Sequence, residues 1–388
     1  MRQLAGAVVL TALVTACASG TVARGRDSSG ARNEGRRFTE SAVAVMQAYD
    51  LESRFQEAAV LGRFASERAR LLGNLAGEAR LQAELGRVLS RQLQHEPGLD
   101  AAQVLELLRR ARRLAEDSGD AHARVAALDA EGMFHYFNKL LAGKGEWAPI
   151  AEQFEQARAL AESSGDARGH SEALFHLGLT RQFQGDAAGA STFFERSLAV
   201  ARASDDALMA SYGLRHLAGL AEERGDLKEA LAGFEESLRL REQVGYRSGQ
   251  VFALVAVASV RSRLDPRGTS ALEPARKALE LALLLKDPAS EREARANLGR
   301  IHLRRDDATA ALPFLEQALA NAESHEDWLT VVEVLLDLGK VHAMRGEPSR
   351  AGERLQRARA VVTDHRLTGS LAQVEQTERE LGAKARAH

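Results

Sequence analysis

Few residues of this chain combine the types and the spacing that catalysis requires. His95 and His325 are each followed by glutamate, as in a helical zinc-binding motif, but the second histidine of that motif is missing. The Gly-Lys-Gly stretch at 143–145 lacks the upstream glycine and the following serine or threonine of a phosphate-binding loop, which is typical of a loop tip. No Gly-x-Ser-x-Gly nucleophile elbow occurs. We therefore expect no enzymatic activity, no bound metal and no cofactor.

Cys17 is the one cysteine, which excludes an internal disulfide and a cysteine-based metal site. It follows a charged start at Arg2 and an apolar run over 4–14 that is too short to span a bilayer as a mature helix. Residues 1–17 resemble a bacterial lipoprotein signal, with Val14 where that family more often has leucine. The resemblance implies a signal peptide over 1–16 and acyl chains, palmitate among them, on Cys17. A plain secretory signal with a nearby small-residue cleavage site is the alternative.

The same resemblance implies a location. Ala18, rather than aspartate, follows Cys17, which outer-membrane sorting allows in a bacterium with two membranes. We expect a lipid-anchored protein of the bacterial cell envelope, on the outer membrane and facing the periplasm. Residues 17–37 are rich in glycine, serine and arginine without apolar periodicity, which predicts a disordered tether with a mean reach of about 25 Å.

Composition favours a helical, globular remainder. The chain has 388 residues, of which 45% are hydrophobic, 27% are charged and only 7 are proline. Alanine, leucine, glutamate and arginine dominate, and all are good helix formers. The net charge of -2 argues against a nucleic-acid partner, because such domains usually carry a basic excess.

A two-helix unit recurs along most of the chain. In the stretch 171–199, two short apolar-striped helices are joined by a break at Gly185 and Asp186, and neither can bury its stripe alone. The small residue of the first helix, at position 8 of the unit, falls at Gly86, Gly132, Gly178, Ala218, Ala258, Gly299 and Gly339. The small residue of the second helix falls at Ala111, Ala157, Ser197, Ser237, Ala278, Ala318 and Ala358. Most intervals are about 40 residues and the early ones about 46.

This pattern resembles the tetratricopeptide repeat, a helix-turn-helix with small residues at positions 8, 20 and 27. The match is carried by Leu177, Gly178, Ala190 and Phe194, by Leu217, Ala230 and Phe234, by Leu298, Gly299, Ala311 and Ala318, and by Leu338, Gly339, Ala351 and Ala358. The resemblance implies an all-α fold, a right-handed α-solenoid of stacked antiparallel helix pairs. We expect the repeat domain over 38–388, with about seven clear repeats over 79–361, two preceding helices over 38–72 and a C-terminal capping helix over about 369–381.

Several copies depart from the repeat pattern. Extra residues around 94–98 and 141–147 predict protruding loops between helices. Pro313 lies well inside a second helix, where its missing N–H predicts a kink. Aspartate or glutamate at the turns is expected to cap the second helices at Asp186, Asp226, Asp307 and Glu347.

The position of each histidine within its repeat indicates a role for it. His135, His302 and His342 share position 11, where the family usually has an aromatic core residue, so we interpret them as packing residues. His176 and His216 share position 6. They could form a metal pair, although the sequence shows no carboxylate partner for them.

Function is then expected on the concave face that the first helices of such an array present. In the family, ligand contacts come mainly from positions 2, 5, 6, 9, 12 and 13. Carried over, these positions give a protein-binding face of Met133, Tyr136, Phe137, Phe175, His176, Phe183, Tyr212, Arg215, Glu222, Glu223, Arg263, Asn297, Arg300, Arg304, Asp337 and Lys340. The aromatic residues predict an exposed binding groove. The alternative is that neighbouring helices cover these rings.

Three hypotheses follow. The first is a membrane-anchored, non-enzymatic adaptor or scaffold that binds a protein or peptide segment, with assembly of an envelope complex as one role that it could serve. The segment would be an amphipathic helix or an extended strand, with acidic groups facing Arg263, Arg300 and Arg304. The second is a structural protein that self-assembles into a homo-oligomer through exposed end repeats. The third is a hidden hydrolase or metal site at His176 and His216.

Overall fold

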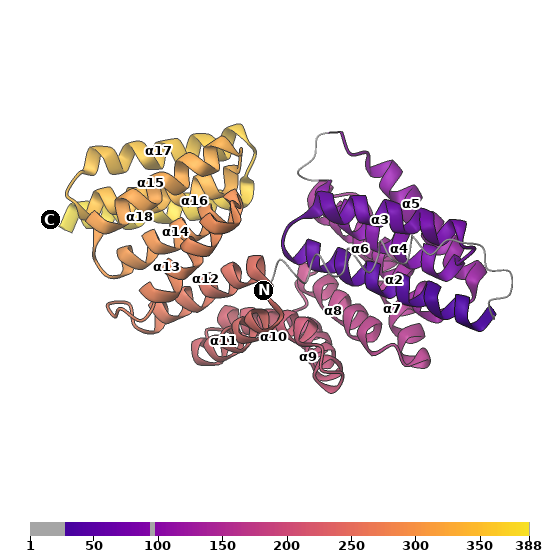
Figure 1. Cartoon of the computed structure of the whole chain (residues 1–388). Coiled ribbons are helices and arrows are strands. Elements are labelled where there is room, and N and C mark those ends of the chain that lie inside the picture. The colour runs from indigo at the N-terminus through magenta and orange to yellow at the C-terminus, as the bar shows by residue number, and fades with distance from the viewer. Residues whose placement is uncertain (1–27, 94–97, 388) are drawn as a thin grey trace. The chain divides into compact units, whose positions relative to one another are not determined.

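The computed structural model describes residues 28–93 and 98–387, and their regular secondary structure is entirely helical. The chain divides into two compact units, Met1–Ser204 and Asp205–His388, which are described separately below. The first unit contains α2 (Ser28–Leu51), α3 (Phe55–Leu71), α4 (Leu75–Gln92), α5 (Ala101–Ser118), α6 (Ala121–Ala142), α7 (Trp147–Ser164), α8 (Ala167–Phe183) and α9 (Ala187–Ala203) (Figure 1).

The second unit contains a further series of helices and ends in a 3₁₀ turn and a last helix. They are α10 (Ala207–Arg224), α11 (Leu227–Val244), α12 (Arg247–Leu264), α13 (Leu272–Leu285), α14 (Pro288–Arg304), α15 (Ala308–Ser324), α16 (Trp328–Met344), α17 (Pro348–Asp364), η1 (Thr368–Ser370) and α18 (Leu371–Ala387).

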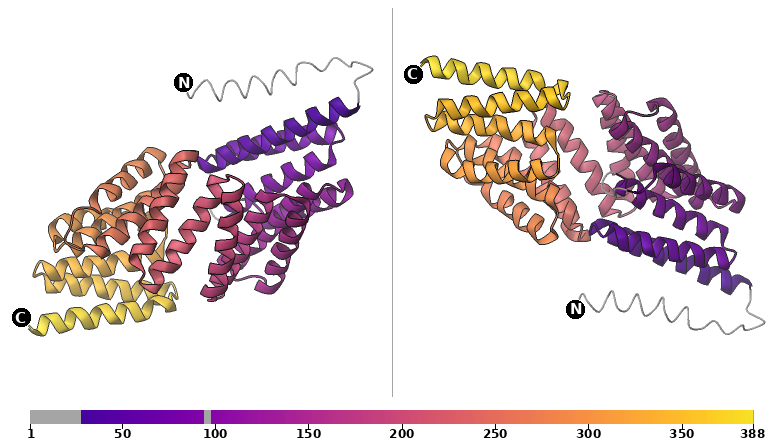
Figure 2. Two further views of the ribbon diagram at one scale, coloured as in Figure 1. Left: turned by 90° about the horizontal axis from the view of Figure 1, so that it is seen from below. Right: turned by 90° about the horizontal axis from the view of Figure 1, so that it is seen from above.

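Each unit is a stack of antiparallel helix pairs. Helices that follow one another in sequence contact each other, and so do the first helices of neighbouring pairs: α4 with α6 and α6 with α8 in one unit, α12 with α14 and α14 with α16 in the other. Figure 2 shows α14 to α18 lying side by side as successive layers. The predicted all-α solenoid of stacked helix pairs is confirmed, and pairs α4–α5 through α16–α17 correspond to the expected repeats.

A close contact between the two helices of a pair explains the recurring small residue at position 8. A Cβ atom added to Gly178 would lie 2.5 Å from a ring carbon of Phe194, and one added to Gly132 would lie 2.7 Å from Phe154. Gly299 faces Leu315 in the same way at 2.5 Å. Only hydrogen fits at these positions, so the glycine lets the large side chain of the second helix reach the first-helix backbone.

Serine hydroxyls make a second recurring contact within pairs. The Ser197 hydroxyl donates to the Ser171 carbonyl at 2.8 Å, and the Ser237 hydroxyl donates to the Ser211 carbonyl at 2.7 Å. All four serines are buried, so these bonds satisfy polar atoms that the close approach of the two helices removes from water.

Two of the four expected turn caps form. Carboxylate oxygens of Asp186 and Asp307 accept hydrogen bonds from the third N–H of the following helix. Asp226 instead pairs with Arg224 at 3.1 Å. Glu347 accepts from Nδ1 of His342 at 2.7 Å and from Arg345 at 3.0 Å. A nearby cation therefore competes with the helix N-terminus for each of these last two carboxylates.

Two expectations about helix ends are wrong, and a third agrees closely with the structure. The first helix of the described residues begins at Ser28 rather than near residue 38, so the predicted tether cannot extend to residue 37. Buried Thr39 donates its hydroxyl to the Gly35 carbonyl, one helical turn back. The loop expected around 141–147 is present as the segment 143–146, between the end of α6 at Ala142 and the start of α7 at Trp147. The last helix begins at Leu371 and reaches Ala387, past the expected end at 381.

Pro313 lies inside α15, and the helix continues through it from Ala308 to Ser324. The expected loop around 94–98 falls largely on residues outside the described ranges, as do the predicted signal peptide and Cys17. Among the described helices, none is both long enough and apolar enough to span a bilayer.

Candidate binding surfaces on the first helices

The aromatic residues of the first unit pack on one another. The Tyr136 ring centroid lies 5.5 Å from that of Phe137 and 5.8 Å from that of Phe183, both with edge-to-face geometry. Trp147, at the start of α7, stacks on Phe183 at 6.4 Å and also contacts Tyr136 at 5.9 Å. Such pairs add stability beyond the area they bury. The cluster leaves Phe183 49% exposed, Phe137 half-buried and Tyr136 buried.

Burial removes the other predicted aromatic contacts from the surface. Phe175 is 7% exposed, and its ring packs against Phe194 at 5.5 Å and against His176 at 5.7 Å. Met133 is buried as well. The predicted exposed aromatic groove is therefore largely covered in this unit, and its accessible part is the edge formed by Phe137, Phe183 and Trp147.

Beside these rings lies a buried network of charged side chains from α4, α6 and α8. The guanidinium of Arg87 lies 3.1 Å from Asp129 and 3.3 Å from Glu172. His176 Nδ1 lies 2.6 Å from the other oxygen of Asp129. Arg168 donates to Glu172 at 2.9 Å. His176 thus has the carboxylate partner that the sequence did not reveal, and the network links three first helices.

The network shifts the pKa values of its acidic groups. Burial alone would raise the pKa of Glu172, but the positive charges of Arg87 and Arg168 hold it at about 2. Burial raises the pKa of Glu84, which faces the same arginine, and the charge of Arg87 only partly opposes the increase. Because these charges satisfy one another, the network acts first as a structural link between first helices.

In the second unit one group of predicted site residues lies on α10 and α12, and another lies on α14 and α16. Tyr212 is half-buried, and its ring lies 6.0 Å from that of Tyr246 in edge-to-face geometry, while Arg215 is exposed on the same helix, α10. Farther along the face, Arg263 forms an ion pair with Glu222 at 2.6 Å. Glu223 is exposed. Arg263 is thus occupied by an internal carboxylate.

A cavity of about 1290 Å³ opens beside α14, α16 and α18. Three predicted cations line it, Arg300, Arg304 and Lys340, and so do four carboxylates, Asp306, Asp337, Glu378 and Glu380. Apolar residues from four helices also line it, among them Leu303, Ala343, Met344, Leu355 and Leu381. The cavity exceeds the roughly 300–1,000 Å³ of sites for drug-sized ligands. Its size and mixed lining suit a peptide segment better than a small molecule.

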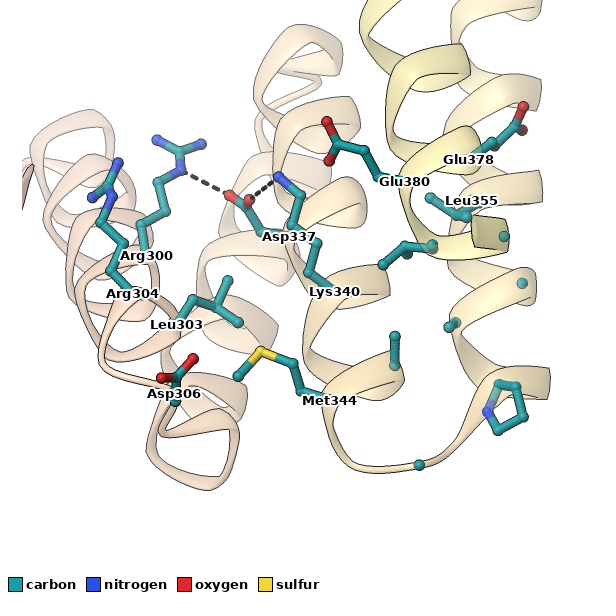
Figure 3. Close-up of a pocket in the computed structure, with 17 residues that line it drawn as sticks. Arg300, Leu303, Arg304, Asp306, Asp337, Lys340, Met344, Leu355, Glu378 and Glu380 are labelled. Carbon is teal, nitrogen blue, oxygen red and sulfur yellow. Dashed lines mark hydrogen bonds and ion pairs between the residues drawn. The ribbon is translucent and has the colours of Figure 1, made fainter. Parts of the chain in front are cut away.

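The charged groups in this cavity are unequally paired. Asp337 accepts from Arg300 at 2.7 Å and lies 3.5 Å from the Lys340 ammonium, and Figure 3 shows it between the two. Arg304 lies beside Arg300 on α14, and its guanidinium donates to the Ser262 hydroxyl at 2.9 Å. Among the described residues no carboxylate lies within ion-pair distance of Arg304. Burial and the charges of Arg300 and Arg263 lower its pKa, and the carboxylates of Asp337 and Glu222 oppose this decrease only in part.

Asn297, also predicted as a contact, is buried in α14, and its Oδ1 has no hydrogen-bond partner. The position-11 histidines differ in their surroundings. His342 is buried and bonds Glu347, His302 stacks on Phe314 with centroids 5.9 Å apart, and His135 is half-buried. Within the described ranges, no group of three or more His, Cys, Asp or Glu side chains could hold a metal ion.

Sequence reasoning missed Arg87, Asp129 and Glu172, although they occupy positions 9, 5 and 2 of their repeats. These positions carry ligand contacts in the family, so the repeat phase was the available signal. It could not distinguish a solvated charge from one buried against the neighbouring first helix. Trp147 was missed because it lies at the start of a second helix, whereas the ligand-contact positions of the family lie on first helices.

Comparisons with known proteins agree with this geometry. Residues 290–364 match the Tetratricopeptide repeat family. A comparison with curated protein sequences finds no match. Similar solved structures include the apo form of the quorum sensor NprR from B. thuringiensis, with a TM-score of 0.59 and 11% identity over 84% of this chain and 87% of that chain.

Two further structures have the same fold. A Rap protein complexed with Competence and Sporulation Factor has a TM-score of 0.53 and 13% identity, over 86% of this chain and 98% of that chain. The STAND protein PH0952 from Pyrococcus horikoshii has a tetratricopeptide repeat sensor. Its structure has a TM-score of 0.58 and 14% identity, over 87% of this chain and 54% of that chain. Residues 290–364 thus match tetratricopeptide repeats directly, and the described chain has the helix-pair fold of tetratricopeptide repeat proteins.

Proposed function

We propose that this chain is a non-enzymatic adaptor that binds a segment of a partner protein in the cavity beside α14, α16 and α18. The helix-pair fold supports a binding role, because stacked repeats present extended surfaces and the two units hold no recognisable catalytic constellation in their described residues. The likeness to the Rap protein that was solved with Competence and Sporulation Factor supports the same kind of role.

The chemistry of the cavity defines the segment. Leu303, Met344 and Leu355 offer an apolar surface, so the segment carries apolar side chains. Arg304 is the observation that carries the proposal, because it is a partly buried cation that lacks a carboxylate partner among the described residues. An aspartate, a glutamate or a terminal carboxylate of the segment would supply that partner.

The anchor belongs to the same proposal. Acyl chains on Cys17 would hold the adaptor on a bacterial envelope membrane, with the outer membrane and its periplasmic face as the expected location. The support is the sequence of residues 1–18 alone. With several chains on one residue, the attachment would be stable, because each buried methylene contributes about 0.8 kcal/mol.

A photoreactive amino acid at position 344 tests the cavity. Met344 is 44% exposed and lines the cavity, so irradiation of cells should join the adaptor to one partner at a defined segment. The same amino acid at exposed Gln356, on α17, serves as the control. The expected result is a discrete product from position 344 that is absent from position 356. Products that are the same from both positions would refute the cavity as the binding site.

A further inference from the structure

A row of exposed apolar side chains follows α3 and continues onto the turn into α4. Val60, Phe64 and Leu71 lie on one face of α3, because residues four and seven positions apart share a helical face. Leu72 and Leu75 extend the row across the turn, and between 41% and 65% of each of the five side chains is exposed. We call these five residues the α3 patch.

The α3 patch is unusual among the second helices of the first unit. Over their whole lengths, all of which the structure describes, α5, α7 and α9 expose no large apolar side chain. Their exposed side chains are small, polar or charged, such as Arg109 on α5 and Glu155 on α7. Single exposed apolar side chains are ordinary on protein surfaces, but a contiguous group of them marks a surface that another molecule covers.

The N-terminal part of α2 lies beside one end of this patch. Asn74, between Leu72 and Leu75 in sequence, donates from Nδ2 to the Thr39 hydroxyl of α2 at 3.5 Å. A Cβ atom added to Gly35 would lie 3.3 Å from the same nitrogen. The beginning of α2 therefore packs against the turn that carries the last two residues of the α3 patch.

A lipid on Cys17 would bring the α3 patch to a bilayer. Ser28, the first residue of α2, follows Cys17 by eleven positions, and eleven residues span at most about 40 Å in any conformation. This proximity rests on the anchor proposed above. Five partly exposed apolar side chains give only weak and reversible membrane binding, so the acyl chains would remain the main attachment.

The charges around the α3 patch suit an anionic surface. Both carboxylates of α3, at positions 57 and 67, already form ion pairs with arginines. Arg63 on α3 and Arg37 near the start of α2 are exposed, and among the described residues no carboxylate lies within ion-pair distance of either. Exposed positive charge beside an apolar surface attracts anionic lipid head groups.

We infer that the α3 patch docks on the surface of an anionic phospholipid bilayer. In this arrangement α3 lies along the membrane plane, and its apolar side chains enter the boundary between head groups and acyl chains. Arg37 and Arg63 face the lipid phosphates. A partner protein or a second copy could also cover apolar side chains, but neither accounts for the position of the patch beside the segment that leads to Cys17.

Flotation of the full chain with vesicles tests the docking. The chain carries Cys17→Ser, so no acyl chain contributes, and any contribution of residues 1–16 is common to every variant. The vesicles contain phosphatidylethanolamine and phosphatidylglycerol, and vesicles of phosphatidylcholine alone are the neutral control. We expect binding to the anionic vesicles that the double substitution Leu71→Ser, Leu72→Ser weakens roughly tenfold or more.

Two leucines of α13 provide the matched control. Leu283 and Leu284 are adjacent, 47% and 68% exposed, and distant in sequence from the α3 patch. The double substitution Leu283→Ser, Leu284→Ser should leave vesicle binding unchanged. An equal loss in both double variants, no loss in the Leu71→Ser, Leu72→Ser chain, or equal binding to neutral vesicles overturns the inference.

An added tryptophan gives a second readout, in which no apolar side chain is lost. Brominated lipids in the anionic vesicles should quench the fluorescence that Phe64→Trp adds to the parent chain, and should not quench that added by Leu284→Trp. Equal quenching of the two overturns the inference. So does light scattering without vesicles if it shows a dimer that Leu71→Ser, Leu72→Ser dissociates, because the patch then binds a second copy. Fractionation of Cys17→Ala tests the anchor separately, so docking and anchor can fail independently.

Discussion

Single residues decide how closely the two helices of a pair approach. The repeat phase predicted the small residue at position 8 and the large one of the second helix, and the structure shows why they occur together: Gly178 leaves room for the Phe194 ring. Such contacts are predictable because they are local and recur with the repeat. The partners of Arg87 and Asp129 were not predictable, since each is chosen by packing between helices some 40 residues apart.

Substitution of Gly178 tests the close contact. Gly178→Ala places a methyl group against Phe194, so we expect a loss of about 1–3 kcal/mol in the free energy of unfolding, measured by urea denaturation. Gly219, inside α10, is the control, because a Cβ atom there meets nothing within 4 Å. Gly219→Ala should stabilise the protein by up to about 1 kcal/mol through helix propensity. A stabilising Gly178→Ala would contradict the packing described here.

The charge network predicts a pH dependence. The folded pKa of Glu172 is about 2, below its ordinary value of 4.5. Its contribution to stability is therefore present above pH 4.5 and is lost as the pH falls from 4.5 towards 2. Glu172→Gln should cost up to about 3 kcal/mol at pH 7, and the difference from the wild type should shrink below pH 4.

Exposed Glu152, on α7, provides the comparison for Glu172. Glu152→Gln should change the free energy of unfolding by less than about 0.5 kcal/mol at either pH. A Glu172→Gln penalty that stays constant between neutral and acidic pH would show that the carboxylate charge does not stabilise the network.

At the scale of elements, the sequence predicted which segments are helices better than where they end. The loop expected before Trp147 forms over 143–146, and α6 ends where Gly143 adopts a left-handed conformation with φ of 66°. Pro313 was expected to kink its helix. The helix assignment of α15 runs through Pro313, and Leu315 and Ala318 beyond it are buried in the core of the second unit.

Proline replacement tests the strain that α15 tolerates. At position 313 the missing N–H leaves the Thr309 carbonyl without its helical partner, and the ring crowds the preceding turn. We expect Pro313→Ala to stabilise the protein by about 1–3 kcal/mol in thermal or urea unfolding. Pro288 is the control, because it is the first residue of α14, where proline removes no helical bond. An equal gain for Pro288→Ala would argue against this explanation.

At the scale of the whole molecule, the fold class followed from the repeat spacing, because a unit that cannot bury its own apolar stripe must stack on its neighbours. The binding surface did not follow as fully. The residues predicted as ligand contacts do lie on first helices, yet packing buries Phe175, pairs Arg263 with Glu222 and leaves Arg304 without a carboxylate among the described residues. Such differences depend on neighbouring repeats, which periodicity does not describe.

The proposed lipid anchor would be a property of the whole molecule, and it can be tested directly. In a bacterium that processes lipoproteins, Cys17→Ala should move the protein from the membrane fraction to a soluble or unprocessed form, and labelled palmitate should no longer be incorporated. Val14→Leu, which restores the residue more common in lipoprotein signals, should retain both. If Cys17→Ala remains in the membrane fraction and is still labelled, Cys17 is not the site of lipidation.

The central claim is that Arg304 binds an acidic group of a partner segment. The most direct measurement is the affinity of the purified chain for the segment identified by cross-linking from position 344, with exposed Arg276→Glu as the charge-matched control. We predict that Arg304→Glu weakens binding roughly tenfold or more, whereas Arg276→Glu has no more than a small effect. Equal affinities for the wild type and Arg304→Glu would contradict the account.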